Sequence, residues 1–330
     1  MYIVKLTFNY DFPIMRQTPN NIGVWGKYKF VIDNELTECD YWIIYSEYKL
    51  TSETVKCNRN NIIFIPAEGI NTSIEYQHYF LKQFGKILTV QREIKHKNLI
   101  YTHNANPWFI GKSYDELINN KAPEKTKLIS VVSSNKAFTA GHIKRLEFVQ
   151  KLKSHFGDKL DVYGRGINDF DDKWDVVAPY KYSIAIENDN CDDWVTEKFF
   201  DCLYANTFTF YYGCPNLEKY VDARSFKRIN IDNFEESVAT IEGIINDETH
   251  YESVAPTLQT IKLNSINRDN FFPWIVSYLQ TMNPNLPKQF ITINSPSVLQ
   301  DIYNRKISTR IIKKINQAVS LLTKTLFSTK

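Results

Sequence analysis

The sequence has few cysteines, and their spacing is unsuited to a structural framework. Its 330 residues include five cysteines, an odd number, at wide and irregular intervals and without a CxxC pair. Zinc sites and disulfide frameworks need closely spaced or evenly paired cysteines, so the sequence favours neither. We therefore expect reduced thiols and a cytoplasmic chain. The cysteines are Cys39, Cys57, Cys191, Cys202 and Cys214.

Long apolar runs and a strong excess of one charge are also missing. No apolar stretch approaches the roughly 20 residues that a membrane-spanning helix needs. The N-terminal MYIVKLTFNYDF lacks the charged, apolar and small-residue segments of a signal peptide. The net charge of +3 is too small to indicate a nucleic-acid-binding protein by itself. We expect a soluble or peripherally attached protein.

Apolar and charged residues occur in ordinary globular proportions. Hydrophobic residues make up 43% of the chain and charged residues 23%, so a substantial core is expected. The length suggests two domains. The chain is also rich in Asn, Ile and Lys, which is typical of AT-rich bacterial and viral genomes.

Short apolar runs alternate with helical patterns in the first half of the chain. The spacing predicts a helix between Ile65 and Ile87, with Ser73 as its N-cap. The strands predicted here are Tyr2–Thr7, Tyr41–Tyr45, Asn61–Ile65, Ile87–Gln91 and Asn98–Tyr101.

A charged stretch with a proline, residues 121–127, interrupts this alternation and predicts a linker. Beyond it the strands Leu128–Val132, Leu160–Tyr163 and Arg228–Ile231 are predicted. Helices are predicted at His142–Phe156, Phe234–Ile245 and Tyr251–Asn264, with further helix up to about Gln280. The first of these helices is expected to bury one face, made of Ile143, Leu146, Val149, Leu152 and Phe156.

Strands that alternate with helices predict parallel sheets with crossover connections. We predict an α/β protein with two Rossmann-like, doubly wound domains that face each other across a cleft. The domains are expected at residues 1–124 and 125–285, followed by a C-terminal helical tail at residues 286–330.

The end of the chain differs in character from the rest. Residues 303–330 contain seven Lys or Arg and no acidic residue, and their apolar residues recur at helical spacing. A basic amphipathic helix of this kind can lie on an anionic membrane surface. It can equally pack on its own domain, and amphipathicity does not separate the two.

The segment Tyr180–Tyr220 carries most of the functional information. It reads as a buried strand ending at Glu187 and Asn188, an acidic loop, a helix that opens at residues 196–198, and a second apolar strand ending at Gly213. In open α/β sheets, ligands bind at the carboxyl ends of the strands. A helix N-terminus with a lysine suits a phosphate group. The segment therefore predicts a nucleotide-diphosphate site.

Several motifs in this region occur together and in order. The chain has Ile186-Glu187-Asn188, then Trp194-Val195-Thr196-Glu197-Lys198, then Tyr212-Gly213-Cys214-Pro215. Upstream are Val132-Ser133-Ser134-Asn135, the helical Arg145, and Asp161-Val162-Tyr163-Gly164. Over about a hundred residues, this series resembles the donor-binding domain of glycosyltransferase family 10, the α-1,3/1,4-fucosyltransferases. The resemblance implies the GT-B arrangement of two Rossmann-like domains.

The resemblance implies a role for each matched residue. Arg145 and Lys198 would hold the diphosphate, Asn188 the sugar-phosphate region, and Glu197 the ribose or the transferred sugar, with Trp194 as an aromatic wall. Charge chemistry agrees, because cations and a helix N-terminus stabilise the negative charge that develops on a leaving diphosphate. The further residues expected at the donor site are Ser133, Asn135, Tyr163, Glu187, Thr196 and Gly213.

An inverting transfer also needs a general base for the acceptor hydroxyl. In the resembled family this base is a glutamate at the end of an apolar strand of the N-terminal domain, and Glu68 is the matching position. Trp108 and His103 are expected on the acceptor side, although a lone His is more often structural. The alternative for Glu68 is an ordinary exposed loop glutamate.

An acidic cluster at Asp169, Asp171, Asp172 and Asp175 resembles a metal-binding motif in composition only. It does not follow a strand in the manner of such a motif, so we expect no metal ligand and no cofactor beyond the nucleotide-sugar donor. Two departures from the resembled family matter. Asp189 stands where many members have Ser, and the N-terminal half matches only thinly.

The resemblance implies a soluble, metal-independent, inverting glycosyltransferase that moves L-fucose from GDP-fucose to a glycan hydroxyl. A second hypothesis keeps the fold but changes the substrates, with another nucleotide sugar such as a UDP-pentose or hexose and a hydroxymethylated DNA base as the acceptor. A third hypothesis is a non-catalytic module that binds a nucleotide sugar. The sequence does not decide the acceptor, the linkage or the oligomeric state.

Overall fold

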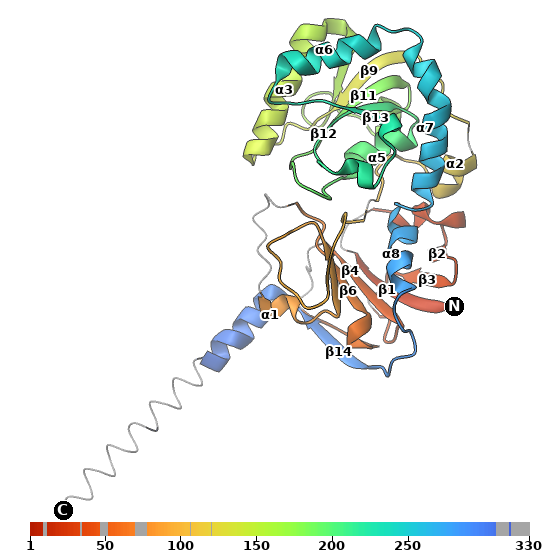
Figure 1. Cartoon of the computed structure of the whole chain (residues 1–330). Coiled ribbons are helices and arrows are strands. Elements are labelled where there is room, and N and C mark those ends of the chain that lie inside the picture. The colour runs from red at the N-terminus through yellow and green to blue at the C-terminus, as the bar shows by residue number, and fades with distance from the viewer. Residues whose placement is uncertain are drawn as a thin grey trace, which may run out of the picture.

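The computed structural model describes residues 1–8, 12–33, 35–46, 52–69, 78–105, 107–119, 121–307 and 317. Two sheets, parallel except for the antiparallel edge strand β2 of the lower one, form the centres of two domains, which lie one above the other (Figure 1). The order of the upper sheet is β10-β9-β11-β12-β13 and that of the lower sheet β2-β3-β1-β4-β6-β7-β8. This confirms the predicted α/β class with two doubly wound domains in the GT-B arrangement.

The bounds of the elements follow. The lower sheet has β1 Tyr2–Phe8, β2 Val24–Trp25, β3 Tyr28–Val31, β4 Tyr41–Tyr45, β6 Ile62–Ile65, β7 Lys86–Thr89 and β8 Leu99–Tyr101; the upper sheet has β9 Lys127–Val132, β10 Leu160–Tyr163, β11 Tyr180–Ile186, β12 Phe208–Tyr212 and β13 Phe226–Arg228; a separate antiparallel pair joins β5 Ser52–Cys57 to β14 Gln289–Asn294. The helices are α1 His78–Leu81, α2 Tyr114–Asn119, α3 Ala140–Phe156, α4 Lys173–Val177, α5 Glu197–Tyr204, α6 Phe234–Ile245, α7 His250–Ile266 and α8 Phe271–Leu279.

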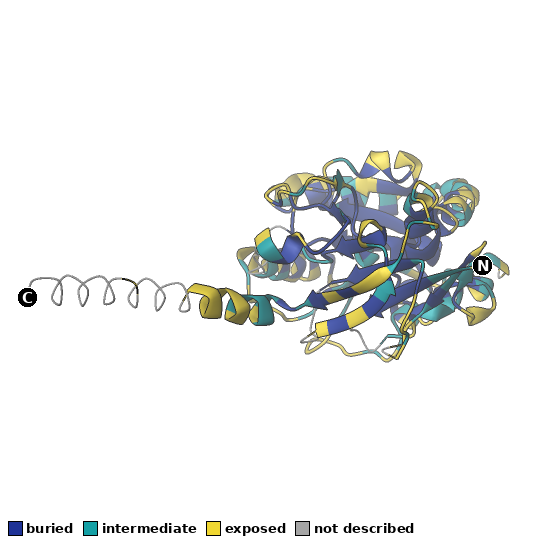
Figure 2. Cartoon of the chain, turned by 90° about the horizontal axis from the view of Figure 1, so that it is seen from below, coloured by how far each residue is buried: buried dark blue, intermediate teal, exposed yellow. Residues whose placement is uncertain are grey.

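The central strands of the lower sheet are buried on both faces. Ile43 of β4 belongs to one hydrophobic cluster, while its neighbours Trp42 and Ile44 belong to the other. Successive side chains of a strand point to opposite faces, so a continuous apolar run fills both layers. In Figure 2 the interior of the molecule is mostly dark blue, which marks buried residues. The run Tyr41–Tyr45 was predicted with its observed bounds.

Two segments cross from one domain to the other. Trp108 and the residues of α2 pack in the upper core, whereas α8 packs against the lower sheet. In Figure 1, α7 and α8 run down one side of the molecule and join the two domains. The domain boundaries at residues 124 and 285 remain predictions. A segment before residue 124 packs in the upper core, and a segment between residues 125 and 285 packs in the lower core.

The predicted helical tail at residues 286–330 begins differently from the expectation. Its first part is β14, which pairs with β5 of the lower domain and buries Ile291 and Ile293. A pattern that alternates apolar and polar side chains is the signature of a strand, and it was missed here. Residues 296–307 are helical and largely exposed towards their end (Figure 2). The rest of the predicted basic helix lies outside the described residues, apart from residue 317.

Three other local predictions differ from the structure. The strand predicted at Arg228–Ile231 lies earlier, at β13. On α3, Ile143 is exposed and Arg145 is buried, because the helix turns the arginine towards the upper sheet. Of the helix predicted between Ile65 and Ile87, only α1 is described, and Ser73 lies outside the described residues.

Candidate active site

Glu187 lies at the carboxyl end of β11 and organises the start of α5. Its carboxylate accepts hydrogen bonds from the Thr196 backbone N–H at 2.9 Å and from the Thr196 hydroxyl at 2.8 and 2.9 Å. Lys198 Nζ lies 3.2 Å from the same carboxylate. Thr196 is the N-cap of α5, and its hydroxyl accepts from the Lys198 N–H. The strand end and the helix start are thus joined through one buried acid.

Gly213 permits this arrangement from the neighbouring strand. It follows β12 with φ +152°, and a Cβ there would lie 2.4 Å from Cγ of Glu187. The Glu187 N–H also donates to the Tyr212 carbonyl at 2.8 Å. A side chain at position 213 would therefore displace Glu187 from Thr196 and Lys198. Gly213 acts from behind the carboxylate, which is a structural role within the predicted donor site.

The charges near α5 alternate and support one another. Burial opposes the charged form of Lys198, but the carboxylates of Glu187 and Glu197 outweigh it and raise the pKa of the lysine above its usual value. Burial raises the pKa of Glu187, against the effect of Lys198. For Glu197, burial also disfavours the charge, but Lys198 and Lys173 together lower its pKa. Lys198 is therefore a fixed cation at the N-terminus of α5.

Arg145 supplies a second cation from α3. Its side chain is 4% exposed, donates to the Asn188 side-chain oxygen, and lies 3.4 Å from the Ser134 carbonyl. Its Nε has no hydrogen-bond partner among the described residues. Burial lowers the pKa of Arg145, with the charge of Glu187 acting in the opposite direction. The guanidinium still remains charged, because arginine deprotonates only at very high pH.

The predicted base and five of the predicted donor residues line one cavity between the domains. It has a volume of about 200 Å³. The upper domain contributes Asn188, Trp194, Thr196, Glu197 and Lys198, and the lower domain contributes Phe8, Tyr45, Ala67, Glu68, Asn104, Ala105, Pro107 and Phe109. Glu68 is half-buried. The predicted general base of the lower domain thus lines the same cavity as predicted sugar-donor residues of the upper domain.

Other predicted residues lie away from this cavity. Ser133 and Asn135 follow β9, where their N–H groups donate to the carbonyls of Tyr163 at 2.7 Å and Arg165 at 3.1 Å. The Ser133 hydroxyl is buried and has no partner among the described residues. The Tyr163 hydroxyl hydrogen-bonds that of Tyr180 at 2.8 Å. These residues lie at the carboxyl ends of β9 and β10, beside the switch point of the sheet.

The two acceptor-side residues are both buried. Trp108 has no exposed surface and donates through Nε1 to the Lys112 carbonyl at 2.7 Å. Its neighbours Pro107 and Phe109 line the cavity instead. His103 packs between the rings of Tyr220 and Trp274, and burial lowers its pKa to about 3. An acceptor-side role for either residue would therefore act through its neighbours.

The acidic cluster at residues 169–175 caps backbone groups. Asp172 is the N-cap of α4 and accepts from the N–H groups of Trp174 at 2.8 Å and Gly111 at 2.7 Å. Asp169 accepts from the Gly166 N–H at 2.8 Å. No group of three or more His, Cys, Asp or Glu side chains suited to a metal ion occurs among the described residues.

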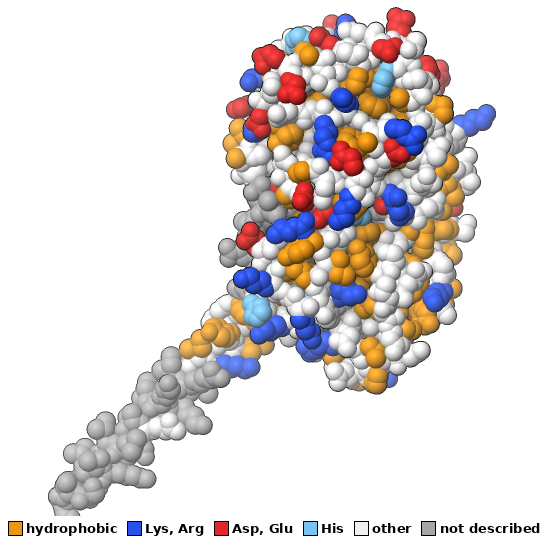
Figure 3. Space-filling view, viewed as in Figure 1, with side chains coloured by type: hydrophobic (Ala, Val, Ile, Leu, Met, Phe, Trp, Pro, Cys, Tyr) orange, Lys and Arg blue, Asp and Glu red, His pale blue; other side chains and the backbone are white. Residues whose placement is uncertain are grey.

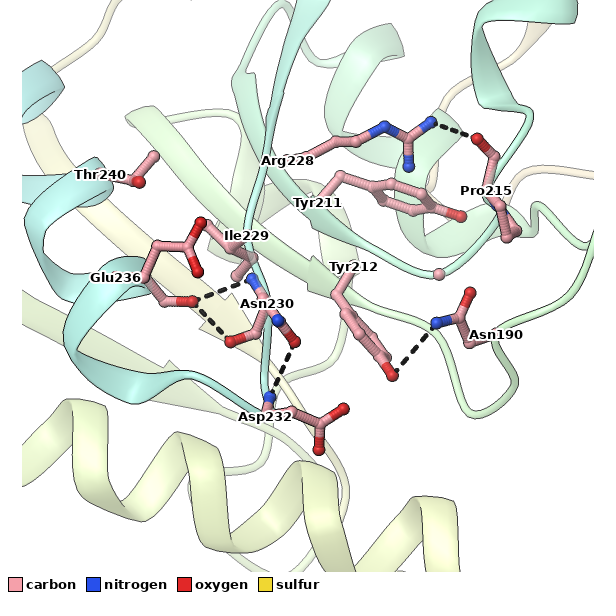
Figure 4. A pocket seen from close by; sticks show the side chains of 12 residues that line it. Asn190, Tyr211, Tyr212, Pro215, Arg228, Ile229, Asn230, Asp232, Glu236 and Thr240 are labelled. Carbon is pink, nitrogen blue, oxygen red and sulfur yellow. Dashed lines mark hydrogen bonds between the residues drawn. The ribbon is translucent and has the colours of Figure 1, made fainter.

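A larger cavity of the upper domain shares none of its described lining residues with the cavity that contains Glu68 and Lys198. Its volume is about 550 Å³, and it opens at the ends of β12 and β13 beside α6 (Figure 4). The Asn190 amide lies 3.4 Å from the Tyr212 hydroxyl at its edge. Of the predicted donor residues only Gly213 lines it. The lining residues are Asn190, Tyr211, Tyr212, Gly213, Pro215, Arg228, Ile229, Asn230, Asp232, Glu236, Ser237 and Thr240.

Sequence reasoning missed part of the lower wall. Phe8 and Tyr45 each stand at the carboxyl end of a central strand, so their position in the predicted sheet was a usable signal. Asn104 follows β8 and donates to the Ala67 carbonyl at 2.8 Å, a contact that no local pattern indicates.

Comparisons with known proteins agree with the family resemblance of the sequence motifs. The model of glycosyltransferase family 10 (fucosyltransferase), C-terminal region, matches residues 122–317, and the chain belongs to this family. An α-1,3-fucosyltransferase of Helicobacter pylori is 27% identical over 101 residues, which are 30% of this chain and 20% of that protein. GDP-fucose protein O-fucosyltransferase 3 of Homo sapiens is 41% identical over 49 residues, 15% of this chain and 10% of that protein.

The solved structures similar to this chain include an α1,3-fucosyltransferase with GDP-fucose. Its TM-score is 0.46 and its sequence identity 13%. That alignment covers 81% of this chain and 90% of the other. The two curated relatives match the chain over at most a fifth of their own lengths. Among the described residues, no helix is both long enough and apolar enough to span a membrane.

Proposed function

We propose that the chain is an inverting glycosyltransferase that transfers L-fucose from GDP-fucose to a glycan hydroxyl without a catalytic metal. One observation supports this most directly. Glu68 of the lower domain and Lys198 of the upper domain line the same cavity. An acid–base group and a cation so arranged suit a reaction in which a hydroxyl loses a proton while an anion departs.

The leaving diphosphate would be held from the upper domain. As the bond between the anomeric carbon and the phosphate oxygen breaks, its electron pair stays on the diphosphate. Lys198, Arg145 and the N-terminus of α5 would stabilise that anion with positive charge. Glu187 keeps Lys198 in place through the 3.2 Å ion pair. The cations and the helix thus supply charge that a divalent metal supplies in other transferases.

The acceptor would be activated from the lower domain. Its hydroxyl oxygen attacks the anomeric carbon from the face opposite the diphosphate, and its proton passes to the carboxylate of Glu68. This geometry inverts the configuration at that carbon, because attack and departure occur on opposite faces. Asn104 supports the base, since its amide holds the carbonyl of Ala67, the residue before Glu68.

The identity of the donor rests on family membership. The family description and the names of both relatives refer to fucosyl transfer, and one name gives GDP-fucose as the donor. The transferred sugar would contact Trp194, Glu197 and Asn188, with the aromatic rings of Phe8 and Tyr45 on the other side. The names of the relatives leave the acceptor open between a glycan and a protein hydroxyl.

A nucleic-acid acceptor with a different nucleotide sugar remains the second candidate. On the face drawn in Figure 3, Lys and Arg side chains predominate over acidic ones on the lower domain, which would attract an anionic acceptor. Such binding weakens steeply with salt. A strong salt dependence of acceptor binding, together with transfer to hydroxymethylated DNA, would favour this candidate over a neutral glycan.

The decisive experiment combines ligand-induced stabilisation with product analysis. A ligand that binds only the folded state raises its apparent stability. We expect GDP and GDP-fucose to raise the melting temperature more than UDP or CDP sugars do, and GDP-fucose to be consumed with a glycan acceptor. A preference for UDP would reject fucose as the sugar. Binding without any transfer or hydrolysis would favour the non-catalytic module.

A further inference from the structure

The buried carboxylate of Asp193 anchors the donor loop, residues 188–196, which carries Asn188, Trp194 and Thr196. Its side chain is 1% exposed. It accepts hydrogen bonds from Asn216 at 3.0 Å, from Lys219 at 3.0 Å and from the Tyr220 hydroxyl. Its own N–H donates to the Asn216 side-chain oxygen at 2.8 Å. Three side chains of one segment of the upper domain, residues 216–220, thus converge on one acid directly before Trp194.

The backbone at this position is also unusual. Asp193 has φ +66°, in the left-handed region that residues other than glycine seldom adopt. The carbonyl of Asp193 accepts from the Val195 N–H at 3.2 Å. The side-chain contacts therefore hold a strained turn, and that turn determines the direction in which Trp194 leaves the loop.

The fourth donor to Asp193 comes from the other domain. Arg92, in the connection between β7 and β8, forms an ion pair with the carboxylate. Its guanidinium lies over the ring of Tyr101, 4.2 Å from the centroid, and the Tyr101 hydroxyl donates to its carbonyl at 3.3 Å. Tyr101 of the lower domain therefore fixes the position from which the Arg92 side chain extends to Asp193 of the upper domain.

The residue before Arg92 continues the connection to the predicted base. The amide of Gln91 lies 3.1 Å from the Glu68 carbonyl and 3.3 Å from the Gly69 carbonyl. Gly69 packs closely on the donor loop, since a Cβ there would lie 3.2 Å from Trp194. A short path of contacts thus joins Asp193, through Arg92 and Gln91, to the backbone of Glu68.

We propose that Arg92 and Asp193 are positioning residues that set the predicted base of the lower domain against the donor loop of the upper domain. The inference rests on the proposed function for its kinetic consequence. Neither residue contacts the reacting atoms. Their contribution lies in alignment, where a misplacement of about 1 Å can lower a rate by about 100-fold.

The ion pair between Arg92 and Asp193 is expected to persist at neutral pH. Burial opposes the charge of Asp193, but its hydrogen bonds from Tyr220, Lys219, Arg92 and Asn216 outweigh burial and lower its pKa below the usual range. The carboxylate is therefore ionised at neutral pH, and the ion pair to Arg92 is present throughout the range in which a transferase would be assayed.

Arg92→Ala tests the proposal, because Arg92 is 43% exposed and Asp193 keeps its three other donors. We expect kcat for transfer to fall about tenfold or more, while the Kd for GDP stays within about twofold and the melting temperature is nearly unchanged. Arg92→Lys should recover part of the rate, since it keeps the charge. Arg224→Ala is the matched control, because Arg224 pairs with Asp222 on the exposed surface of the upper domain.

A second measurement does not depend on turnover. Hydrogen exchange of the loop at residues 188–196 should become faster in Arg92→Ala and stay unchanged in Arg224→Ala. Wild-type kcat in Arg92→Ala, or exchange equal to wild type, would overturn the positioning role. A wild-type protein that transfers no sugar while Arg92→Ala still loosens the loop would reject the proposed function and leave the link between the domains intact.

Discussion

Lys198 and Glu187 form an ion pair of 3.2 Å in which the carboxylate is fully buried and the ammonium is 21% exposed. The pair lies where β11 ends and α5 begins, so one contact joins the framework of the upper domain to the proposed diphosphate site. Removing one member of a buried pair leaves the other charge without compensation. Folding and activity are therefore coupled at this position, and experiments need to separate them.

We predict that Lys198→Met lowers both stability and activity. The free energy of unfolding should fall by roughly 3 kcal/mol, because Glu187 keeps only its bonds to Thr196. The rate of transfer should fall about 100- to 1,000-fold through loss of charge at the leaving group. Urea unfolding and initial rates measure the two effects.

The double variant Glu187→Gln with Lys198→Met separates these effects. A glutamine oxygen can still accept from Thr196, and position 187 no longer carries an unpaired charge, so most of the lost stability should return. Activity should not return. If the double variant regains wild-type turnover, Lys198 serves folding alone, and the proposed stabilisation of the diphosphate is wrong.

We predict that Glu68→Gln abolishes most transfer without affecting donor binding. General base catalysis contributes about 100- to 10,000-fold, so kcat should fall within that range. Stabilisation by GDP should remain, because the proposed diphosphate groups lie in the other domain. Glu35→Gln, at an exposed position of the lower domain, provides the control. Equal turnover in the two variants would exclude Glu68 as the base.

Much of the fold could be predicted because its central strands are continuous apolar runs. β4 and β10 were predicted with their observed bounds, and α6 likewise. β5 was missed because Glu53, one of its three buried residues, is charged and breaks the apolar alternation, and its partner β14 lies more than 200 residues later. Edge pairing between distant segments leaves little trace in a local pattern.

In the candidate site too, contacts within one segment could be predicted from the sequence, whereas contacts between distant segments could not. Glu187, Thr196 and Lys198 lie within one strand–loop–helix segment and contact one another. Because they are also close in the sequence, local motifs were enough to predict that they belong to one site. Asp193 lies in the same loop, yet its partner Arg92 is 101 residues away. No periodicity indicates that contact. It depends on how the domains pack, which sequence patterning does not describe.

We predict a rise in stability with pH that arises from Lys125. Its Nζ donates to three neutral oxygens, of Ala178 and Ala205 at 2.8 Å and Thr207 at 2.9 Å. Burial lowers its pKa to about 7. Between pH 7 and roughly 10.4, the unfolded chain holds a proton that the folded chain lacks. The free energy of unfolding therefore rises with pH in this window, by at most about 1.4 kcal/mol per unit.

Lys125→Met removes the titrating group and should flatten this rise. The measurement is urea unfolding of both proteins from pH 6.5 to 9, with the difference between them plotted against pH. Lys151→Met, at an exposed position, should retain the wild-type slope. Parallel curves for Lys125→Met and the wild type would show that the buried amine keeps its proton.

The pairing of β5 with β14 predicts a stability effect confined to the lower domain. Ile293 has no exposed surface and packs in the cluster behind the sheet, whereas Phe290 on the same strand is 71% exposed. Ile293→Ala should lower the free energy of unfolding by about 2–5 kcal/mol, through lost burial and the cavity that remains. Phe290→Ala should change it by less than about 0.5 kcal/mol. Stabilisation by GDP should persist in Ile293→Ala, because the proposed diphosphate groups lie in the upper domain. A fall in GDP affinity as large as the fall in stability would show that β14 also supports the donor site.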